Sequence, residues 1–96
     1  MTLETSRLSG HKNIVPDNDT KLAIARADNP KLVGTFKLCV DTSGTVSSIK
    51  MMKSTGFANY DQTIEQAMHD WRYRPFLSGG KPTPVCTAVT FIYTQG

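Results

Sequence analysis

The sequence predicts an α+β fold, in which a small antiparallel three-stranded sheet (order β-β-α-β) has one amphipathic helix packed on one face, with a short N-terminal helix added. Three observations carry this prediction. Two segments of alternating apolar and polar residues flank a glycine-containing turn, a helix with one apolar face follows, and a third alternating segment ends the chain. So few strands form a core only when a helix covers one face of the sheet.

Length and composition are those of one small domain. The chain has 96 residues, of which 39% are hydrophobic and 20% charged, and its net charge is +3. This mildly basic balance does not by itself indicate nucleic-acid binding. No run approaches the roughly 20 apolar residues of a membrane span, and the N-terminal segment lacks the apolar region of a signal peptide. We therefore expect a cytoplasmic chain or a fragment without its targeting segment.

The first part of the chain, residues 1–32, is expected to be an arm with a short helix, ahead of a domain over residues 33–96. The arm begins polar and rich in turn formers. Good helix formers follow in residues 20–27, with Asp19 or Thr20 as the N-cap. Asn29-Pro30 would end this helix, because the residue before a proline disfavours helical geometry.

Residues 34–41 alternate with the period of a half-buried strand, and Phe36, Leu38 and Val40 lie on its predicted core face. The turn chemistry of Thr42-Ser43-Gly44 follows. This segment is therefore the first strand of a β-hairpin.

Residues 46–53 form the second strand of the hairpin. Val46 is out of phase with Ile49 and Met51. The mismatch predicts a bulge or a late strand start near Ser47-Ser48, because an extra residue shifts every later side chain to the other face.

The long helix is predicted to begin at Asn59, as the N-cap of a capping box with Gln62, while Asp61 adds a favourable charge to the first turn. Its apolar face has helical spacing, and its members are Tyr60, Ile64, Ala67, Met68 and Trp71. Pro75 would end the helix and direct the chain toward the last strand. Residues 78–82 would form a loop.

Residues 85–93 form the third strand. One face carries Val85, Thr87, Val89, Phe91 and Tyr93, and the other carries Cys86, Ala88, Thr90 and Ile92. The core and structural residues expected from all elements are Phe36, Leu38, Val40, Ile64, Ala67, Met68, Trp71 and Pro75.

The sequence contains no pattern that indicates catalysis or a bound metal. Its two cysteines and two histidines lack zinc-site spacing, and no nucleophile elbow, paired-carboxylate motif or phosphate loop is present. We expect no enzyme activity, cofactor or metal. The basic residues Lys50, Lys53, Arg72, Arg74 and Lys81 are interpreted as solvated surface. Because the strand aromatics fall on the core face, no nucleic-acid partner is expected.

Short motifs along the second part of the chain resemble the C-terminal domain of TonB. In order, they are Gly34, Val40-Asp41, Gly44-Thr45-Val46, Ser54-Thr55-Gly56, Asp61, Ala67, Trp71-Arg72-Tyr73-Arg74-Pro75, Gly80-Lys81-Pro82 and Val89-Thr90-Phe91. The match runs from about Gly34 to Tyr93. The order and spacing of the motifs carry the resemblance, since each motif alone also has a structural explanation.

The resemblance implies a periplasmic domain that binds a short extended peptide, the TonB box, of a TonB-dependent outer-membrane transporter, as part of energy transduction for transport. Energy transducers of this family carry an N-terminal membrane helix and a proline-rich linker, which this sequence lacks. The parent protein is then expected to be anchored in the inner membrane, and to reach the inner-membrane motor only through that missing N-terminal segment. The alternatives are a non-transducing interaction or scaffold module of the cell envelope, and a cytoplasmic regulator.

In the family, the third strand lies antiparallel beside the first and forms the edge of the sheet, so one row of its backbone groups is unpaired. A peptide can add there as a further strand. The expected partner-binding residues are Val85, Thr87, Ala88, Val89, Thr90, Phe91, Ile92 and Tyr93. Self-pairing of this edge into a homodimer, or an edge without a partner, are the alternatives.

The same strand order implies that Cys39 and Cys86 lie opposite each other on the face away from the long helix. This placement predicts a disulfide, which in turn indicates a periplasmic or external location. The alternative is a pair of small thiols in a reducing compartment.

Overall fold

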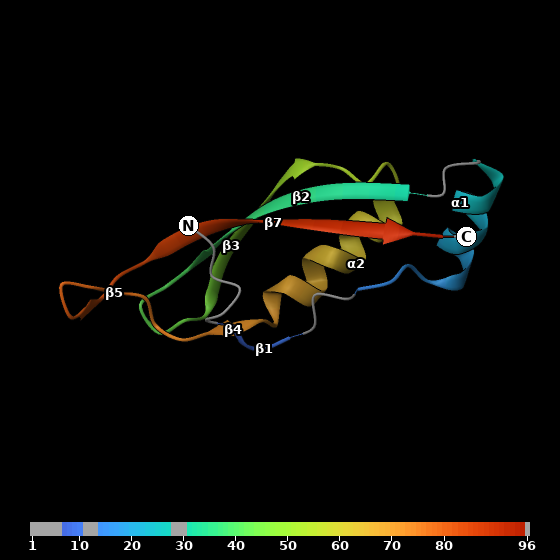
Figure 1. Cartoon of the computed structure of the whole chain (residues 1–96). Helices are drawn as coiled ribbons and strands as arrows, with labels where there is room; N and C mark the ends of the chain where they lie inside the picture. Colours follow the sequence, from blue (N-terminus) through green and yellow to red (C-terminus); the bar gives the residue numbers. More distant parts are fainter. Residues whose placement is uncertain (1–6, 11–13, 28–30, 96) are drawn as a thin grey trace.

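The structure is a computed structural model that describes residues 7–10, 14–27 and 31–95. The molecule is elongated, with principal extents of 51 × 19 × 19 Å (Figure 1). Its elements in chain order are β1 (Arg7–Ser9), α1 (Asn18–Arg26), β2 (Lys31–Val40), β3 (Val46–Lys53), α2 (Ala58–His69), β4 (Arg72–Tyr73), β5 (Leu77–Ser78), β6 (Lys81–Pro82) and β7 (Val85–Thr94).

The main sheet has three antiparallel strands in the order β3-β2-β7, and α2 packs against one face (Figure 1). This confirms the predicted fold class. The core between sheet and helix contains Ile24, Leu32, Phe36, Leu38, Val40, Val46, Tyr60, Ile64, Met68, Trp71, Tyr73, Val89 and Phe91. Among the expected core residues, Ala67 is half-buried and Pro75 is exposed, so Pro75 does not fill the core.

Strand β2 begins at Lys31, earlier than the predicted start at Gly34. Its first residues are held by pairing, because Lys31 lies opposite Thr94 and Val33 opposite Ile92. Local periodicity could not show this, since the partners come from the far end of the chain.

The β2–β3 turn depends on the side chain of Asp41. Its carboxylate accepts hydrogen bonds from the backbone N–H groups of Ser43 (2.9 Å) and Thr45 (3.0 Å). Gly44 has a φ of +86°, and a Cβ there would lie 1.9 Å from the carbonyl oxygen of Tyr73, so only glycine fits. The predicted bulge is confirmed: Cys39 pairs with Ser48 and Val40 with Val46, which leaves Ser47 as the extra residue.

Helix α2 begins two residues earlier than predicted and without the expected capping box. The N-cap is Phe57, which makes no side-chain capping bond, so the assignment of this role to Asn59 was wrong. The carboxylate of Asp61 instead accepts bonds from the backbone N–H (2.9 Å) and hydroxyl (2.7 Å) of Thr55. Asp61 is buried, and it ties the start of the helix to the β3–α2 connection.

The helix ends at His69, well before Pro75, so the prediction that Pro75 ends it was wrong. The chain turns at Asp70, and the backbone N–H of Trp71 still bonds the Met68 carbonyl at 3.1 Å. This last contact keeps the Trp71 ring on the apolar face of the helix, where it is fully buried.

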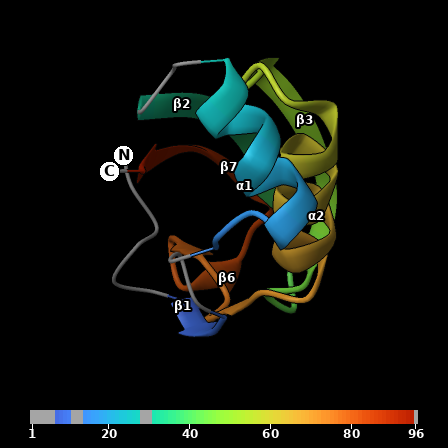
Figure 2. The ribbon, with the colours of Figure 1, turned by 90° about the vertical axis from the view of Figure 1, so that its right-hand side faces the viewer.

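Helix α1 lies across one end of the molecule (Figure 2). Its N-cap is Asp17, whose carboxylate accepts from the Thr20 N–H at 2.8 Å, so the predicted caps Asp19 and Thr20 lie inside the helix. The predicted stop at Asn29-Pro30 lies outside the described residues. The side chain of Ile24 is buried in the core.

Two features of the arm and loops were not predicted. Strand β1 pairs with β4, and the guanidinium of Arg7 stacks 4.5 Å from the centroid of the Trp71 ring. The expected loop over residues 78–82 is part of a small β5–β6 hairpin. Gly79 and Gly80 form its turn with φ values of +60° and +80°, which suits a two-residue hairpin turn.

Candidate functional site: the open edge of β7

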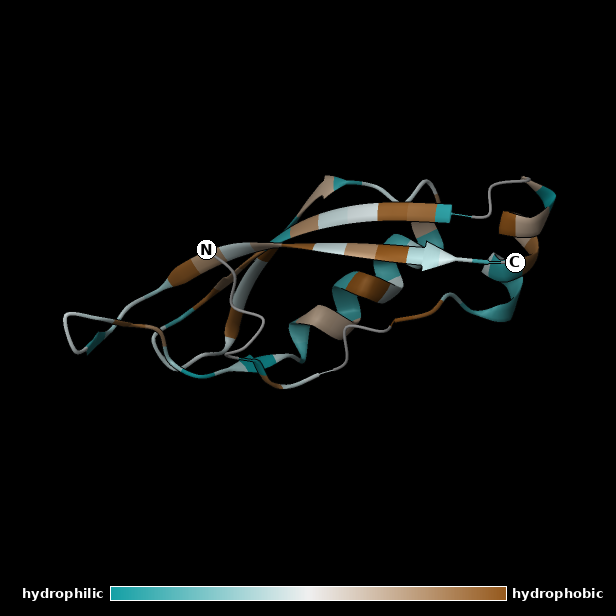
Figure 3. Cartoon of the chain, viewed as in Figure 1, coloured by the Kyte–Doolittle hydropathy of each residue, from teal (hydrophilic) through white to brown (hydrophobic). Residues whose placement is uncertain are grey.

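Strand β7 forms one edge of the main sheet. Ten consecutive residue pairs join it to β2, from Lys31 opposite Thr94 to Val40 opposite Val85, without a bulge. In the described part of the chain no strand pairs with its other side. The strand contains no charged residue, glycine or proline, and Figure 3 shows brown, hydrophobic bands along it that are separated by pale ones. It therefore has the features of an edge that can accept a further strand.

The side chains of β7 lie on the two faces as the sequence predicted. Thr87, Val89 and Phe91 are buried and Val85 and Tyr93 half-buried, on the side of α2. The other face exposes Cys86, Ala88, Thr90 and Ile92. The structure thus places all the expected partner-binding residues on this one strand, while their role in binding stays a prediction.

The exposed residues of β7 also direct backbone groups to the open edge. The Cα atoms of Cys39 and Cys86 are 3.9 Å apart, the close spacing of a non-hydrogen-bonded antiparallel pair. Such pairs alternate with hydrogen-bonded ones along a ladder, so Ala88 and Thr90 belong to the same class as Cys86. Their N–H and C=O groups therefore point away from β2.

The opposite edge of the sheet, β3, is irregular. Its register with β2 shifts twice, once at Ser47 and once between the pairs Thr35–Lys53 and Phe36–Met51. It also carries Lys50 and Lys53. Bulges and lysines are the devices by which proteins prevent an edge strand from pairing, so β7 is the better edge for strand addition.

Cys39 and Cys86 form a disulfide between β2 and β7, as predicted. The two residues are direct cross-strand partners. They lie on the sheet face opposite α2, where Cys86 is exposed and Cys39 half-buried. The bond therefore attaches the edge strand covalently to the centre of the sheet.

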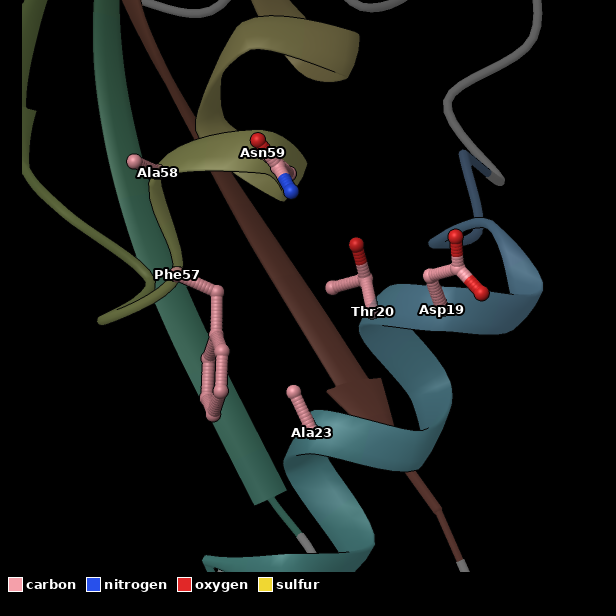
Figure 4. A pocket seen from close by; sticks show the side chains of 6 residues that line it. All are labelled: Asp19, Thr20, Ala23, Phe57, Ala58 and Asn59. Carbon is pink, nitrogen blue, oxygen red and sulfur yellow. The ribbon is translucent and has the colours of Figure 1, made fainter.

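A hollow of about 190 Å³ lies between the starts of α1 and α2 (Figure 4). Its lining residues are Asp19, Thr20, Ala23, Phe57, Ala58 and Asn59. Figure 4 shows that Thr20 and Ala23 point from α1 toward the Phe57–Asn59 segment. The hollow is lined from both segments, and its one carboxylate is that of Asp19.

Tyr60 anchors the arm beneath the sheet. Its hydroxyl donates a hydrogen bond to the Ile14 carbonyl at 2.7 Å, and its ring meets that of Tyr93 edge-on at 5.8 Å. Burial, followed by the charge of Tyr93, raises the pKa of Tyr60. The phenol therefore stays protonated as a donor over the neutral range.

Side chains that could hold a metal ion do not cluster in the described part of the chain. Over the described ranges no cluster of three or more His, Cys, Asp or Glu side chains is present. Among the same residues no helix is long and apolar enough to span a membrane. The fold and the open edge define a small α+β module whose distinctive surface is an uncharged edge strand suited to protein interaction.

The chain belongs to the family of Gram-negative bacterial TonB protein C-terminal domains, whose family model matches residues 25–94. It is therefore a non-enzymatic domain of TonB-type energy transduction, and domains of this family are periplasmic. A disulfide agrees with that oxidising compartment. A search of curated proteins gives no match.

The fold is similar to a solved structure, the solution NMR structure of the Pseudomonas aeruginosa TonB C-terminal domain. The TM-score is 0.65 at 22% sequence identity, and the alignment covers 92% of this chain and 83% of that one. At this identity the similarity shows a shared fold. The aligned region covers most of both chains, so the similarity extends beyond the three strands and α2.

Proposed function

We propose that the open edge of β7 binds an extended peptide of a TonB-dependent outer-membrane transporter, the TonB box, by strand addition. The parent protein would be anchored in the inner membrane and would connect this domain to an inner-membrane motor through a segment upstream of it. The domain would then transmit force to the transporter through the bound peptide.

The observation that carries this proposal is the difference between the two sheet edges. Strand β7 is regular and uncharged over ten residues, whereas β3 is bulged and carries lysines. The expected free energy of binding also suits a transient interaction with the peptide. Each added backbone hydrogen bond contributes about 0.5–1.5 kcal/mol net, so a few of them give modest affinity while sharing a load along the strand.

The test replaces Ala88 with proline, which removes an N–H that faces the open edge and leaves the β2 ladder bonds of its neighbours in place. We expect affinity for a transporter N-terminal peptide to fall by about tenfold, as the loss of one hydrogen bond with local distortion predicts. Titration calorimetry would measure it, and circular dichroism would verify that the variant folds.

Met51→Pro is the matched control, since Met51 pairs with Phe36 on the opposite edge strand. This variant places proline on the edge where no peptide is expected to bind, so its affinity for the transporter peptide should equal that of the wild type. Unchanged affinity in a folded Ala88→Pro variant would refute the edge assignment.

The uncharged edge could also pair with the β7 of a second copy, which would make a homodimer. Sedimentation at increasing protein concentration distinguishes the two cases. In the proposed function, excess peptide shifts any dimer to the monomeric complex, because both compete for one edge. A dimer that persists with saturating peptide bound would place the peptide elsewhere.

A further inference from the structure

We infer that Lys37 forms a carboxylate-binding subsite beside the β7 edge, so that a peptide paired with β7 binds best when it carries an acidic side chain opposite Ala88. This inference rests on the proposed function and adds a chemical preference to it. It comes from the sheet face opposite α2, where Lys50 and Lys53 were first interpreted only as solvated surface.

That face is cationic and has no acidic neighbour within the sheet. Strands β2, β3 and β7 contain no aspartate or glutamate. Their charged residues are Lys31, Lys37, Lys50 and Lys53, all exposed. A second copy stacked on this face would bring like charges together, so the face favours an anionic partner.

Within this face Lys37 lies between two different neighbours. Its partner on β3 is Lys50, and its partner on β7 is Ala88. Like charges directly opposite on adjacent strands destabilise a sheet, so the Lys37 ammonium is favoured on the side away from Lys50. The short Ala88 side chain leaves that side open toward the edge.

A hollow of about 270 Å³ provides room beside Lys37. It is lined by Lys37, Met52, Cys86, Thr87 and Ala88. Lys37 is its only charged lining residue, and the exposed side chains beside it are the Met52 thioether, the disulfide of Cys86 and the Ala88 methyl group. A single cation among uncharged walls suits one carboxylate with a short apolar stem.

A strand added to β7 would bring such a group within reach. Paired residues on adjacent strands share a face, and strands lie about 4.8 Å apart. The peptide residue paired with Ala88 would therefore lie on the open face, two strand spacings from Lys37. The four-carbon lysine stem extends over Ala88 from one side, and a glutamate or aspartate extends from the other.

The test uses peptides as long as β7, with a host sequence of alternating valine and threonine. One glutamate is moved along the host, and each glutamate peptide is compared with its glutamine counterpart. We expect a single glutamate position to bind about two- to fivefold more tightly than glutamine, as measured for exposed ion pairs. The preference should disappear in Lys37→Met and weaken in high salt.

Lys53→Met is the matched control. Lys53 lies on the same face but on β3, opposite Thr35, with the whole of β2 between it and β7. It removes the same charge without touching the subsite, so the glutamate preference should remain. A preference that remains in Lys37→Met, or that falls equally in both variants, would overturn the subsite and indicate a diffuse cationic field.

The remaining outcomes separate this inference from the function beneath it. If glutamate and glutamine peptides bind equally at every position, the Lys37 subsite is wrong while strand addition stands. If no host peptide binds, the proposed function itself fails and the subsite falls with it.

Discussion

Aspartates hold the turns of this small protein through backbone hydrogen bonds. Asp17 accepts from the Thr20 N–H at the start of α1, and Asp41 accepts from Ser43 and Thr45 at the β2–β3 turn. The hydrogen bond from the Thr20 side chain lowers the pKa of Asp17, and that from the Ser43 side chain lowers the pKa of Asp41, both from 3.8. Each carboxylate is therefore a better acceptor when ionised.

The lowered pKa of Asp41 predicts that acid weakens the hairpin turn. A lowered folded pKa contributes stability that is present above the unfolded value of 3.8 and is lost as pH falls through the folded pKa. In an NMR titration, we expect the Ser43 and Thr45 amide resonances to shift with a midpoint below 3.8. Asp41→Asn should abolish this titration, and a midpoint at or above 3.8 would contradict the hydrogen-bonded turn.

At the scale of elements, the N-terminal arm packs on the domain at several separate points. Arg7 stacks on Trp71, the Tyr60 hydroxyl bonds the Ile14 carbonyl, and the Gln95 side-chain amide bonds the Lys21 carbonyl at 2.8 Å. Gly10 allows the first of these contacts, since its φ is +109° and a Cβ there would lie 2.2 Å from the Trp71 ring. The arm therefore completes the cover over the core.

Gly10→Ala should displace β1 from Trp71 and leave the main sheet folded. Trp71 is the one tryptophan of the chain, so tryptophan fluorescence reports the surroundings of this ring. We expect a red shift and stronger quenching by iodide, because the ring becomes exposed to water. Added strain at positive φ costs about 1–3 kcal/mol.

Gly79→Ala is the control variant, because it adds backbone strain without displacing β1 from Trp71. Gly79 has a φ of +60°, and a Cβ added there would meet nothing within 4 Å, so the substitution adds a positive-φ cost without touching the Trp71 ring. Its tryptophan spectrum should match the wild type. Equal spectra for both alanine variants would mean that β1 does not cover Trp71.

At the scale of the whole molecule, the disulfide decides how β7 is held. The edge strand has a neighbour on one side only among the described residues, so it is held by the β2 ladder, the Cys39–Cys86 bond and the core packing of Val89 and Phe91. If a peptide bound at the open edge is pulled, the force passes through the hydrogen bonds between the peptide and β7. It then passes through the hydrogen bonds between β7 and β2. In the proposed function, the covalent bond would keep β7 on the sheet while the hydrogen bonds to the peptide separate.

Removing the disulfide should destabilise the domain without changing its fold. The cysteines are separated by 47 positions, and closing a loop of this length contributes about 4 kcal/mol in the chain-entropy model. The double variant Cys39→Ser and Cys86→Ser should lose up to that free energy of unfolding in a urea titration. Reductant should destabilise the wild type and leave the double variant unchanged. A wild type insensitive to reductant would contradict the bond's role.

Features that depend on neighbouring residues could be predicted from the sequence. The strand faces, the turn at Gly44, the bulge at Ser47 and the apolar face of α2 were all predicted, because the periods of strand and helix are written within a few residues. The disulfide followed only with the strand order that the resemblance to the TonB family supplied. That resemblance also indicated β7 as the binding edge.

Features that join distant parts of the chain became visible only in the folded structure. Asp61 bonds Thr55 instead of completing a capping box, β1 pairs with β4, and Lys37 lies between Lys50 and Ala88. The regularity of β7 and the bulges of β3 likewise appear only once the strands are paired. A side chain's partner across the sheet is set by register and packing, which no local pattern contains.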